Sequence, residues 1–205
     1  LTGLSPRRRR TASTSRLADV AVSLPWRRHF RIYVFIAGAM MRVGFGYDSH
    51  RFAANEPFDG DVAQKLGGVP IHGCPKLIGH SDADVLIHAV IDALLGAAAL
   101  GDIGSHFPDT DPRWRGADSA VMLCSVVKEI GDAGYDVGNV DATVICERPK
   151  IRPFVNAIRA RLAAYLDVPE TSVSVKGKTN EGMDAVGAGV GIEVHAVAML
   201  VPGRD

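Results

Sequence analysis

The pattern of apolar and polar positions from residue 41 onward predicts a mixture of strands and helices. Five segments carry a strand pattern, either alternation or a short continuous apolar run, and they span residues 42–48, 65–71, 137–146, 172–176 and 191–201. Glycines interrupt the second segment, and a polar loop precedes it. The last segment is a long apolar run, which is typical of a strand at the centre of a sheet or at an interface.

Three further segments repeat apolar residues at the helical period of 3.6, and they span residues 81–100, 118–133 and 153–166. Ser81 and Asp82 precede the first apolar positions of the longest segment and are its expected N-terminal caps. Residues 101–104 end this helix, and Gly134 ends the second one. A turn-rich loop at residues 107–112 separates the two helices.

The expected elements follow the order strand, strand, helix, helix, strand, helix, strand, short element, strand. This order favours an α/β (α+β) sandwich, in which a mixed sheet of four to five strands has its helices packed on one face. The opposite face of such a sheet is left bare, and a bare apolar face is usually covered by a partner. We therefore expect an oligomer.

Residues 1–40 differ in composition from the remainder and are treated as an N-terminal extension. They hold eight Arg and one acidic residue, a net charge of +7, and many Ser and Thr. One interpretation is translated upstream sequence on a protein of the bacterial cytoplasm. The alternative is a transit peptide, which would direct the protein to the plastid stroma. In both cases the folded domain is expected to span residues 41–205.

The domain itself is acidic. Residues 41–205 carry the other 15 of the 23 basic residues and 22 of the 23 acidic ones, a net charge of −7, which argues against a nucleic-acid partner. The apolar run at residues 32–41 is far shorter than the ~20 residues that a membrane helix needs, so no membrane partner is expected. Three cysteines without paired spacing argue against a disulfide framework.

Asp48, His50 and His88 offer one carboxylate and two imidazoles, a set that can hold a divalent metal with one position open to a ligand. Asp48 and His50 are two residues apart, so on a strand their side chains lie on the same side. Ordinary hydrogen-bonded core histidines are the competing interpretation, but the combination of three such residues favours the metal. Mixed nitrogen and oxygen ligands suit Zn²⁺, while Mn²⁺ or Fe²⁺ stays open.

His88 also belongs to a polar stripe on the expected helix, whose members recur every fourth residue: His80, Asp84, His88 and Asp92. A polar stripe needs partners if it is buried. A metal at His88 would supply one, and Asp84 or Asp92 could accept a hydrogen bond from a ligating imidazole.

Two loops carry groups that suit a phosphorylated ligand. In residues 100–104 the glycines allow close backbone approach, and Asp102 could accept hydrogen bonds from sugar hydroxyls, although a plain helix C-terminus has the same pattern. Residues 176–181 place two lysines, a hydroxyl and a carboxylate together. This mixture fits a phosphate with a second, oxygen-liganded cation, and its alternative is a solvated turn.

Taken together, these segments resemble the 2-C-methyl-D-erythritol 2,4-cyclodiphosphate synthase family. The shared stretches are GYDSH with the preceding Gly44, HSDADVLIHAVIDALLGAAALGDIG at 80–104, FPDTDP at 107–112, GADS at 116–119, GYDVGNVDATVI at 134–145 and RPKIRP at 148–153. The similarity covers nearly all of residues 42–201.

The resemblance implies a metal-assisted cyclisation by a homotrimer with active sites between neighbouring subunits. The 2-phosphate of 4-diphosphocytidyl-2-C-methyl-D-erythritol 2-phosphate would attack the β-phosphorus of the same molecule, so that CMP leaves and a cyclic diphosphate forms. Asp48, His50 and His88 would bind Zn²⁺ or another divalent metal. Glu181 would bind Mg²⁺ or Mn²⁺ together with the substrate diphosphate.

The resemblance also implies roles for the surrounding residues. His80 would stabilise the reacting phosphate, and Thr179 would stabilise the transition state. Residues 102–104 would hold the ribose, 107–111 the erythritol part, and 146–152 of the adjacent subunit the cytosine. The implied substrate contacts are Ser49, Ser81, Asp102, Ile103, Gly104, Phe107, Pro108, Asp109, Thr110, Asp111, Cys146, Pro149, Lys150, Ile151, Arg152, Lys178 and Asn180.

The chain departs from the family pattern at two places. Residues 178–181 read Lys-Thr-Asn-Glu where the family often has Thr-Thr-Thr-Glu, and Ala188 and Val190 replace an Arg and a Glu. The second change removes charges that an isoprenoid diphosphate site on the trimer axis would use. Two other functions stay open: a metal-dependent phosphohydrolase with water as nucleophile, and a non-catalytic trimeric nucleotide-binding protein.

Overall fold

The computed structural model describes residues 40–54, 57–58 and 63–203. The expected extension over residues 1–40 lies outside these ranges, apart from Met40. The strands are β1 (Arg42–Arg51), β2 (Ala63–Leu66), β3 (Val69–His72), β4 (Tyr135–Ile145), β5 (Val173–Lys178) and β6 (Gly191–Pro202). The α-helices are α1 (Val85–Ala98), α2 (Ile103–His106), α3 (Ser119–Asp132), α4 (Val155–Leu166) and α5 (Asp184–Gly187).

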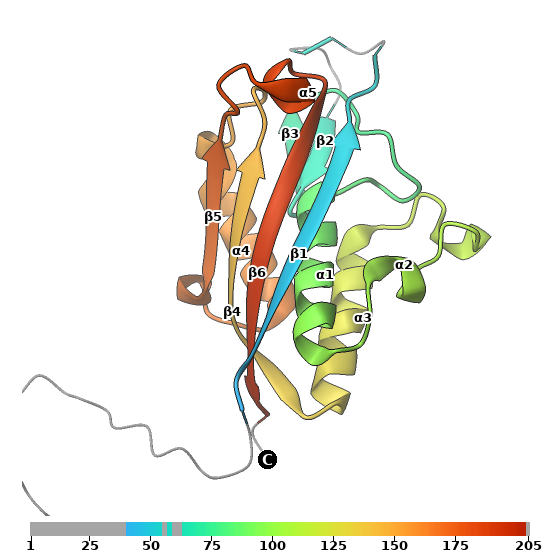
Figure 1. Cartoon of the computed structure of the whole chain (residues 1–205), viewed down its shortest axis with the longest axis vertical. Helices are drawn as coiled ribbons and strands as arrows, with labels where there is room; N and C mark the ends of the chain where they lie inside the picture. Colours follow the sequence, from blue (N-terminus) through green and yellow to red (C-terminus); the bar gives the residue numbers. More distant parts are fainter. Residues whose placement is uncertain (1–39, 55–56, 59–62, 204–205) are drawn as a thin grey trace, which may run out of the picture. The chain divides into compact units, whose positions relative to one another are not determined.

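The main sheet has four strands in the order β1-β6-β4-β5 (Figure 1). Strand β6 pairs antiparallel with both β1 and β4, whereas β4 and β5 are parallel. The expectation of a mixed sheet with helices on one face is confirmed, because α1 and α4 lie behind the sheet in Figure 1 and α3 packs beside them. Strand β1 is longer than the predicted 42–48, since it pairs with β6 as far as Arg51.

The prediction of one strand over residues 65–71 is wrong. This segment is part of a separate hairpin, in which β2 and β3 pair antiparallel across Gly67 and Gly68. Both glycines have positive φ angles, 60° and 74°. Two consecutive residues of this kind form the tight turn that suits a two-residue hairpin loop, and glycine adopts them without steric cost.

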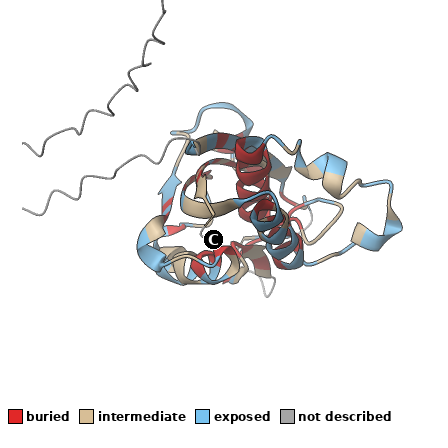
Figure 2. Cartoon of the chain, turned by 90° about the horizontal axis from the view of Figure 1, so that it is seen from below, coloured by how far each residue is buried: buried red, intermediate tan, exposed pale blue. Residues whose placement is uncertain are grey.

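Side chains alternate between the two faces of the sheet, as strand geometry requires. Val194, Ala196 and Ala198 of β6 face the helices and are fully buried, and buried residues gather in the interior of the domain in Figure 2. The other face is bare within one chain, and its exposed apolar residues include Phe45 (61% exposed) and Val197 (42%).

Strand β1 and helix α1 touch through their backbones. A Cβ atom built on Gly44 would lie 2.0 Å from the carbonyl oxygen of Ala93, and one built on Gly46 would lie 2.0 Å from that of Ala89. Only glycine fits at such distances. This close approach brings the residues that follow Gly46 on β1 next to the first turns of α1.

Asp84 caps helix α1, so the prediction that Ser81 and Asp82 cap it is wrong. The Asp84 carboxylate is fully buried and accepts hydrogen bonds from the backbone N–H groups of Ile87, Gly67 and Gly68. It therefore joins the helix to the hairpin turn, which neither Ser81 nor Asp82 does. Because α1 begins only at Val85, His80 lies before the helix and not on its polar stripe.

Candidate active site

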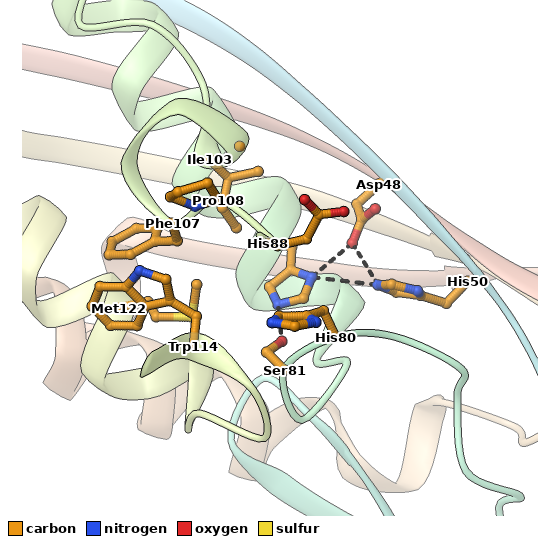
Figure 3. A pocket seen from close by; sticks show the side chains of 12 residues that line it. Asp48, His50, His80, Ser81, His88, Ile103, Phe107, Pro108, Trp114 and Met122 are labelled. Atoms are coloured by element: carbon orange, nitrogen blue, oxygen red, sulfur yellow. Dashed lines mark hydrogen bonds and ion pairs between the residues drawn. The ribbon is translucent and has the colours of Figure 1, made fainter. Parts of the chain in front are cut away.

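Asp48, His50 and His88 converge as the sequence predicts (Figure 3). Asp48 Oδ2 lies 3.1 Å from His50 Nε2 and 2.9 Å from His88 Nδ1, and the two nitrogens are 3.4 Å apart. A tetrahedral Zn²⁺ with bonds of about 2.0–2.1 Å has neighbouring ligand atoms ~3.3 Å apart. The triangle therefore fits a tetrahedral ion and leaves its fourth position for a ligand.

The two ring nitrogens of His50 have different partners. Nδ1 lies 2.9 Å from the carbonyl oxygen of Ile78, an acceptor that can only receive a hydrogen bond. Nδ1 is therefore the protonated nitrogen, and Nε2 is left with a lone pair directed at the triangle. This is the usual way in which a protein fixes the tautomer of a ligating histidine.

The charges of the triangle support one another. Burial alone would raise the pKa of Asp48, but its contacts with the imidazoles of His50 and His88 lower it to about 2. Burial alone would lower the pKa of His50, but the neighbouring Asp48 carboxylate raises it. The Asp48 carboxylate is thus ionised at neutral pH, as a metal ligand must be.

The His88 imidazole is bonded to Asp48, Ser81 and Ser119 and not to the carboxylate of Asp84 or Asp92, so the prediction that one of these two orients it is wrong. Asp84 is occupied by the three backbone groups described above, and Asp92 accepts from the N–H of Ile103 (2.8 Å). The Nε2 atom of His88 instead lies 2.9 Å from Ser119 Oγ and 3.1 Å from Ser81 Oγ. The sequence pattern did not indicate Ser119, because it is 31 residues away in the chain.

A cavity of about 390 Å³ opens beside the triangle. Figure 3 shows the polar side chains on one side and an apolar wall on the other, where Phe107 and Trp114 pack edge to face with ring centroids 4.9 Å apart. The lining residues are Asp48, His50, His80, Ser81, His88, Ile103, Gly104, Phe107, Pro108, Asp109, Trp114 and Met122. Sequence reasoning missed Trp114 and Met122. The first ends a short 3₁₀ helix, Pro112–Trp114, and the second lies on α3.

Several predicted site residues lie near the cavity without lining it. Asp102 caps α2 by accepting from the N–H of Ser105 (2.8 Å), and Asp111 pairs with Arg113. Thr110 is not among the lining residues. Ser49 is exposed between two residues that face α1, so alternation places it on the bare face of the sheet.

The other predicted residues form a second cluster, where the parallel strands β4 and β5 end. The N–H of Cys146 donates to the carbonyl oxygen of Lys178 (3.0 Å), and Thr179 Oγ1 donates to Glu181 Oε1 (2.6 Å). This cluster holds residues 146–152 and 178–181. None of these residues lines the described cavity beside the triangle.

The sheet register shows how far apart the two groups are. Ser49, Glu193, Ile145 and Lys178 form one row across β1, β6, β4 and β5. Three spacings between neighbouring strands amount to ~14 Å. The metal triangle and the second cluster therefore lie at opposite edges of the sheet, near the same end of its strands.

The profile of the YgbB family matches residues 41–201 of the chain. The chain belongs to this family. It is 53% identical to a 2-C-methyl-D-erythritol 2,4-cyclodiphosphate synthase of Pseudomonas savastanoi over 161 residues, which cover 78% of this chain and 99% of that protein. It is 51% identical to the same enzyme of Salinibacter ruber over 160 residues, 78% of this chain and 98% of that one.

A solved structure, the IspF–CDP complex of Plasmodium falciparum, superposes on this YgbB family member with a TM-score of 0.69. The two are 35% identical, and the match covers 80% of this chain and 97% of the other. Among the residues described here, no helix of this YgbB family member has the length and apolar character needed to cross a membrane.

Glu147 lies in the segment 146–152 that was predicted to hold the cytosine, but sequence reasoning gave it no role of its own. Its Oε1 atom accepts from the N–H of Asn180 (3.0 Å) and from that of Gly182 (3.4 Å). The carboxylate thereby ties the turn that carries Thr179 and Glu181 to the loop after β4. Its place between two predicted contacts, Cys146 and Pro149, was the available signal.

Proposed function

We infer that the protein converts 4-diphosphocytidyl-2-C-methyl-D-erythritol 2-phosphate to 2-C-methyl-D-erythritol 2,4-cyclodiphosphate and CMP, a step of non-mevalonate isoprenoid biosynthesis. The observation that carries this inference is the triangle of Asp48, His50 and His88, with one ligand position facing a cavity, in a chain that matches the curated synthases over almost their whole length. The reaction is an intramolecular phosphoryl transfer. An oxygen of the 2-phosphate bonds to the β-phosphorus, and the bond from that phosphorus to CMP breaks.

Catalysis needs positioning and charge neutralisation and no protein nucleophile. Asp48, His50 and His88 would hold Zn²⁺ or another divalent metal, which would supply a Lewis acid for the phosphates. Glu181 would hold the Mg²⁺ or Mn²⁺ that accompanies the diphosphate. The domain carries a net charge of −7, so its overall field opposes an anionic substrate and makes local cations more important.

His80 is the proposed contact to the reacting phosphate. Its Nε2 atom is buried and has no hydrogen-bond partner among the described residues, although His80 lines the cavity beside His88 and Ser81 (Figure 3). A buried polar nitrogen without a partner is costly unless a ligand completes it. A phosphate oxygen at this position would remove that cost.

The remaining substrate contacts follow the division of the site. Residues 102–104 hold the ribose and residues 107–111 the erythritol part, with Ser81 nearby before α1, while Ser49 faces the bare side of the sheet. Residues 146–152 hold the cytosine, while Lys178, Thr179 and Asn180 face the phosphates. Thr179 stabilises the transition state.

The protein acts as a homotrimer whose active sites lie between subunits. Two observations support this proposal. The bare sheet face exposes Val43, Phe45 and Tyr47, the kind of apolar surface that a partner covers. In addition, the loop proposed to bind the base lies at the opposite sheet edge from the metal ligands, which favours a second copy bringing its own loop to the cavity.

A turnover assay with the cytidylated substrate tests the function. We expect CMP release together with a cyclic diphosphate in the ³¹P NMR spectrum, loss of both on chelation, and recovery with Zn²⁺ and Mg²⁺. His88→Ala should abolish turnover and lower the zinc content. Linear phosphates as products would instead identify a phosphohydrolase, and bound CMP without turnover would identify a nucleotide-binding protein.

Complementation between inactive variants tests the shared site. His88→Ala destroys the metal triangle and Glu181→Ala the second cluster, so neither homotrimer should turn over substrate. Random mixed trimers would combine an intact triangle with an intact neighbouring cluster at about one site in four, and should regain up to ~25% of the wild-type rate. No recovery after subunit exchange would show that each site is built within one subunit.

Light scattering tests the assembly face. Phe45→Lys puts a charge on the bare sheet face and should yield monomers. Val121→Lys is the matched control, because Val121 is equally exposed (64%) but lies on α3. Trimers of the Phe45→Lys variant would rule out this face as the interface.

A further inference from the structure

A chain of buried polar side chains leads away from the metal triangle. The first member after His88 is Ser119, which is fully buried at the start of α3 and whose Oγ lies 2.9 Å from His88 Nε2. Ser119 Oγ donates to Asp82 Oδ1 at 2.5 Å. The other oxygen of Asp82 pairs with Lys65 Nζ at 3.3 Å.

The hydrogen positions in this chain follow from what each group can do. The Asp82 carboxylate beside the Lys65 ammonium can only accept, and Ser119 has a single hydroxyl hydrogen. That hydrogen is used in the bond to Asp82, so Ser119 Oγ can only accept from His88. His88 therefore carries its hydrogen on Nε2, and the lone pair of Nδ1 points at the triangle.

We propose that Ser119 and Asp82 are positioning residues that hold His88 in the tautomer that binds the metal through Nδ1. Neither belongs to the metal triangle or lines the cavity. The proposal rests on the metal site of the proposed function and adds to it the cause of the ligand's orientation. Groups that orient a ligating histidine in this way change metal affinity, typically by 10- to 100-fold when they are removed.

The arrangement links the metal triangle to the hairpin. Lys65 belongs to β2, Asp82 to the loop before α1, and Ser119 to α3. Three separate elements thus contribute to one chain of contacts that ends at the His88 imidazole. The second oxygen near His88 Nε2 is Ser81 Oγ, at 3.1 Å. This oxygen accepts a hydrogen bond from the N–H of Ala83, and Ser81 lines the cavity. The hydroxyl hydrogen of Ser81 therefore stays available to a ligand.

Zinc affinity measured by competition with a chromophoric chelator tests the proposal without any turnover. Ser119→Ala should weaken zinc binding by about 10- to 100-fold, since it removes the acceptor of the Nε2 hydrogen. Ser125→Ala is the matched control: Ser125 lies on the same helix, but its hydroxyl donates to the carbonyl oxygen of Met122. Its zinc affinity should equal that of the wild type. Wild-type affinity in a folded Ser119→Ala variant would overturn the proposal.

Nitrogen-15 NMR of the zinc-loaded wild type gives a test that needs no variant. His88 should show a protonated Nε2 and a zinc-bound Nδ1, and binding through Nε2 would overturn the proposal even if Ser119→Ala does not fold. The two inferences fail in different ways. Wild-type protein that binds zinc but releases no CMP contradicts the proposed function alone, while normal turnover with zinc affinity insensitive to Ser119 contradicts the positioning role alone.

Discussion

Replacing Gly46 by Ala should damage the metal site through the backbone. The new Cβ would lie 2.0 Å from the carbonyl oxygen of Ala89 and 2.5 Å from the nitrogen of Ala93, whereas real Cβ contacts essentially never fall below 3.0 Å. Strand β1 and helix α1 must therefore separate by about 1 Å, a form of overpacking that costs ~1–3 kcal/mol of unfolding free energy. The atoms that this Cβ would meet all belong to the backbone of a buried helix, so no flexible side chain can relieve the overlap.

The same displacement separates the metal ligands. Asp48 follows Gly46 on β1, while His88 immediately precedes Ala89 on α1. Metal–ligand distances in protein sites hold to within about 0.2 Å, so a shift of ~1 Å is about five times what the site tolerates. Zinc affinity should therefore fall along with stability.

Chelator competition and urea unfolding measure the two effects on the same protein. Gly44→Ala is a demanding control. Its Cβ would also lie 2.0 Å from a carbonyl oxygen, that of Ala93, but Gly44 is further along β1 from the metal ligands than Gly46 is. It should lose similar stability and less zinc affinity. Gly131→Ala on α3 meets nothing within 4 Å and should gain up to ~1 kcal/mol with unchanged zinc binding. Wild-type zinc affinity in Gly46→Ala would refute the reasoning.

Three other predictions concern groups away from the triangle. Asp84→Ala leaves three backbone N–H groups without their acceptor and should lower the unfolding free energy by ~3 kcal/mol or more in urea titrations, and an unchanged midpoint would contradict the role of this cap. Glu147→Leu should lower turnover and raise the Mg²⁺ concentration needed for half-maximal rate, because it removes the acceptor of two backbone N–H groups. Glu147→Gln keeps an accepting oxygen and should match the wild type. Equal turnover rates of the two variants would exclude a positioning role for Glu147. Burial raises the pKa of the Cys74 and Cys146 thiols to about 12, so at pH 8 only ~10⁻⁴ of each is thiolate. Alkylation of the native protein should therefore modify exposed Cys124 alone, which mass spectrometry of its peptides can check.

The sequence predicts the elements whose apolar period is clear. The strands at residues 137–146 and 191–201 and the three long helices agree with the structure to within a few residues, because burial of one face leaves a regular pattern. Asp48 and His50 could be paired from strand alternation alone. Their convergence with His88 was predicted from the ligand types of the three residues, since spacing alone does not place a strand beside a helix, and it is confirmed.

The failures have a common physical origin in contacts between distant residues. The cap of α1 could not be identified locally, because Asp84 is selected by the hairpin turn at Gly67 and Gly68 as well as by the helix. The partner of His88 is Ser119 and not Asp84 or Asp92, since the packing of α3 against α1 decides which group reaches the imidazole. Periodicity carries no information on either choice.

The order in which the strands are synthesised has a consequence for biogenesis. Strand β6 lies between β1 and β4, yet it is the last of the six to leave the ribosome. Until it emerges, β1 and the β4–β5 pair have no hydrogen-bonded connection, and both expose unpaired edges that invite aggregation. A nascent chain stalled before residue 191 should consequently depend on chaperones. We also expect the pairing of β6 with β1 to be the slow step of folding, because the two strands are far apart in the sequence.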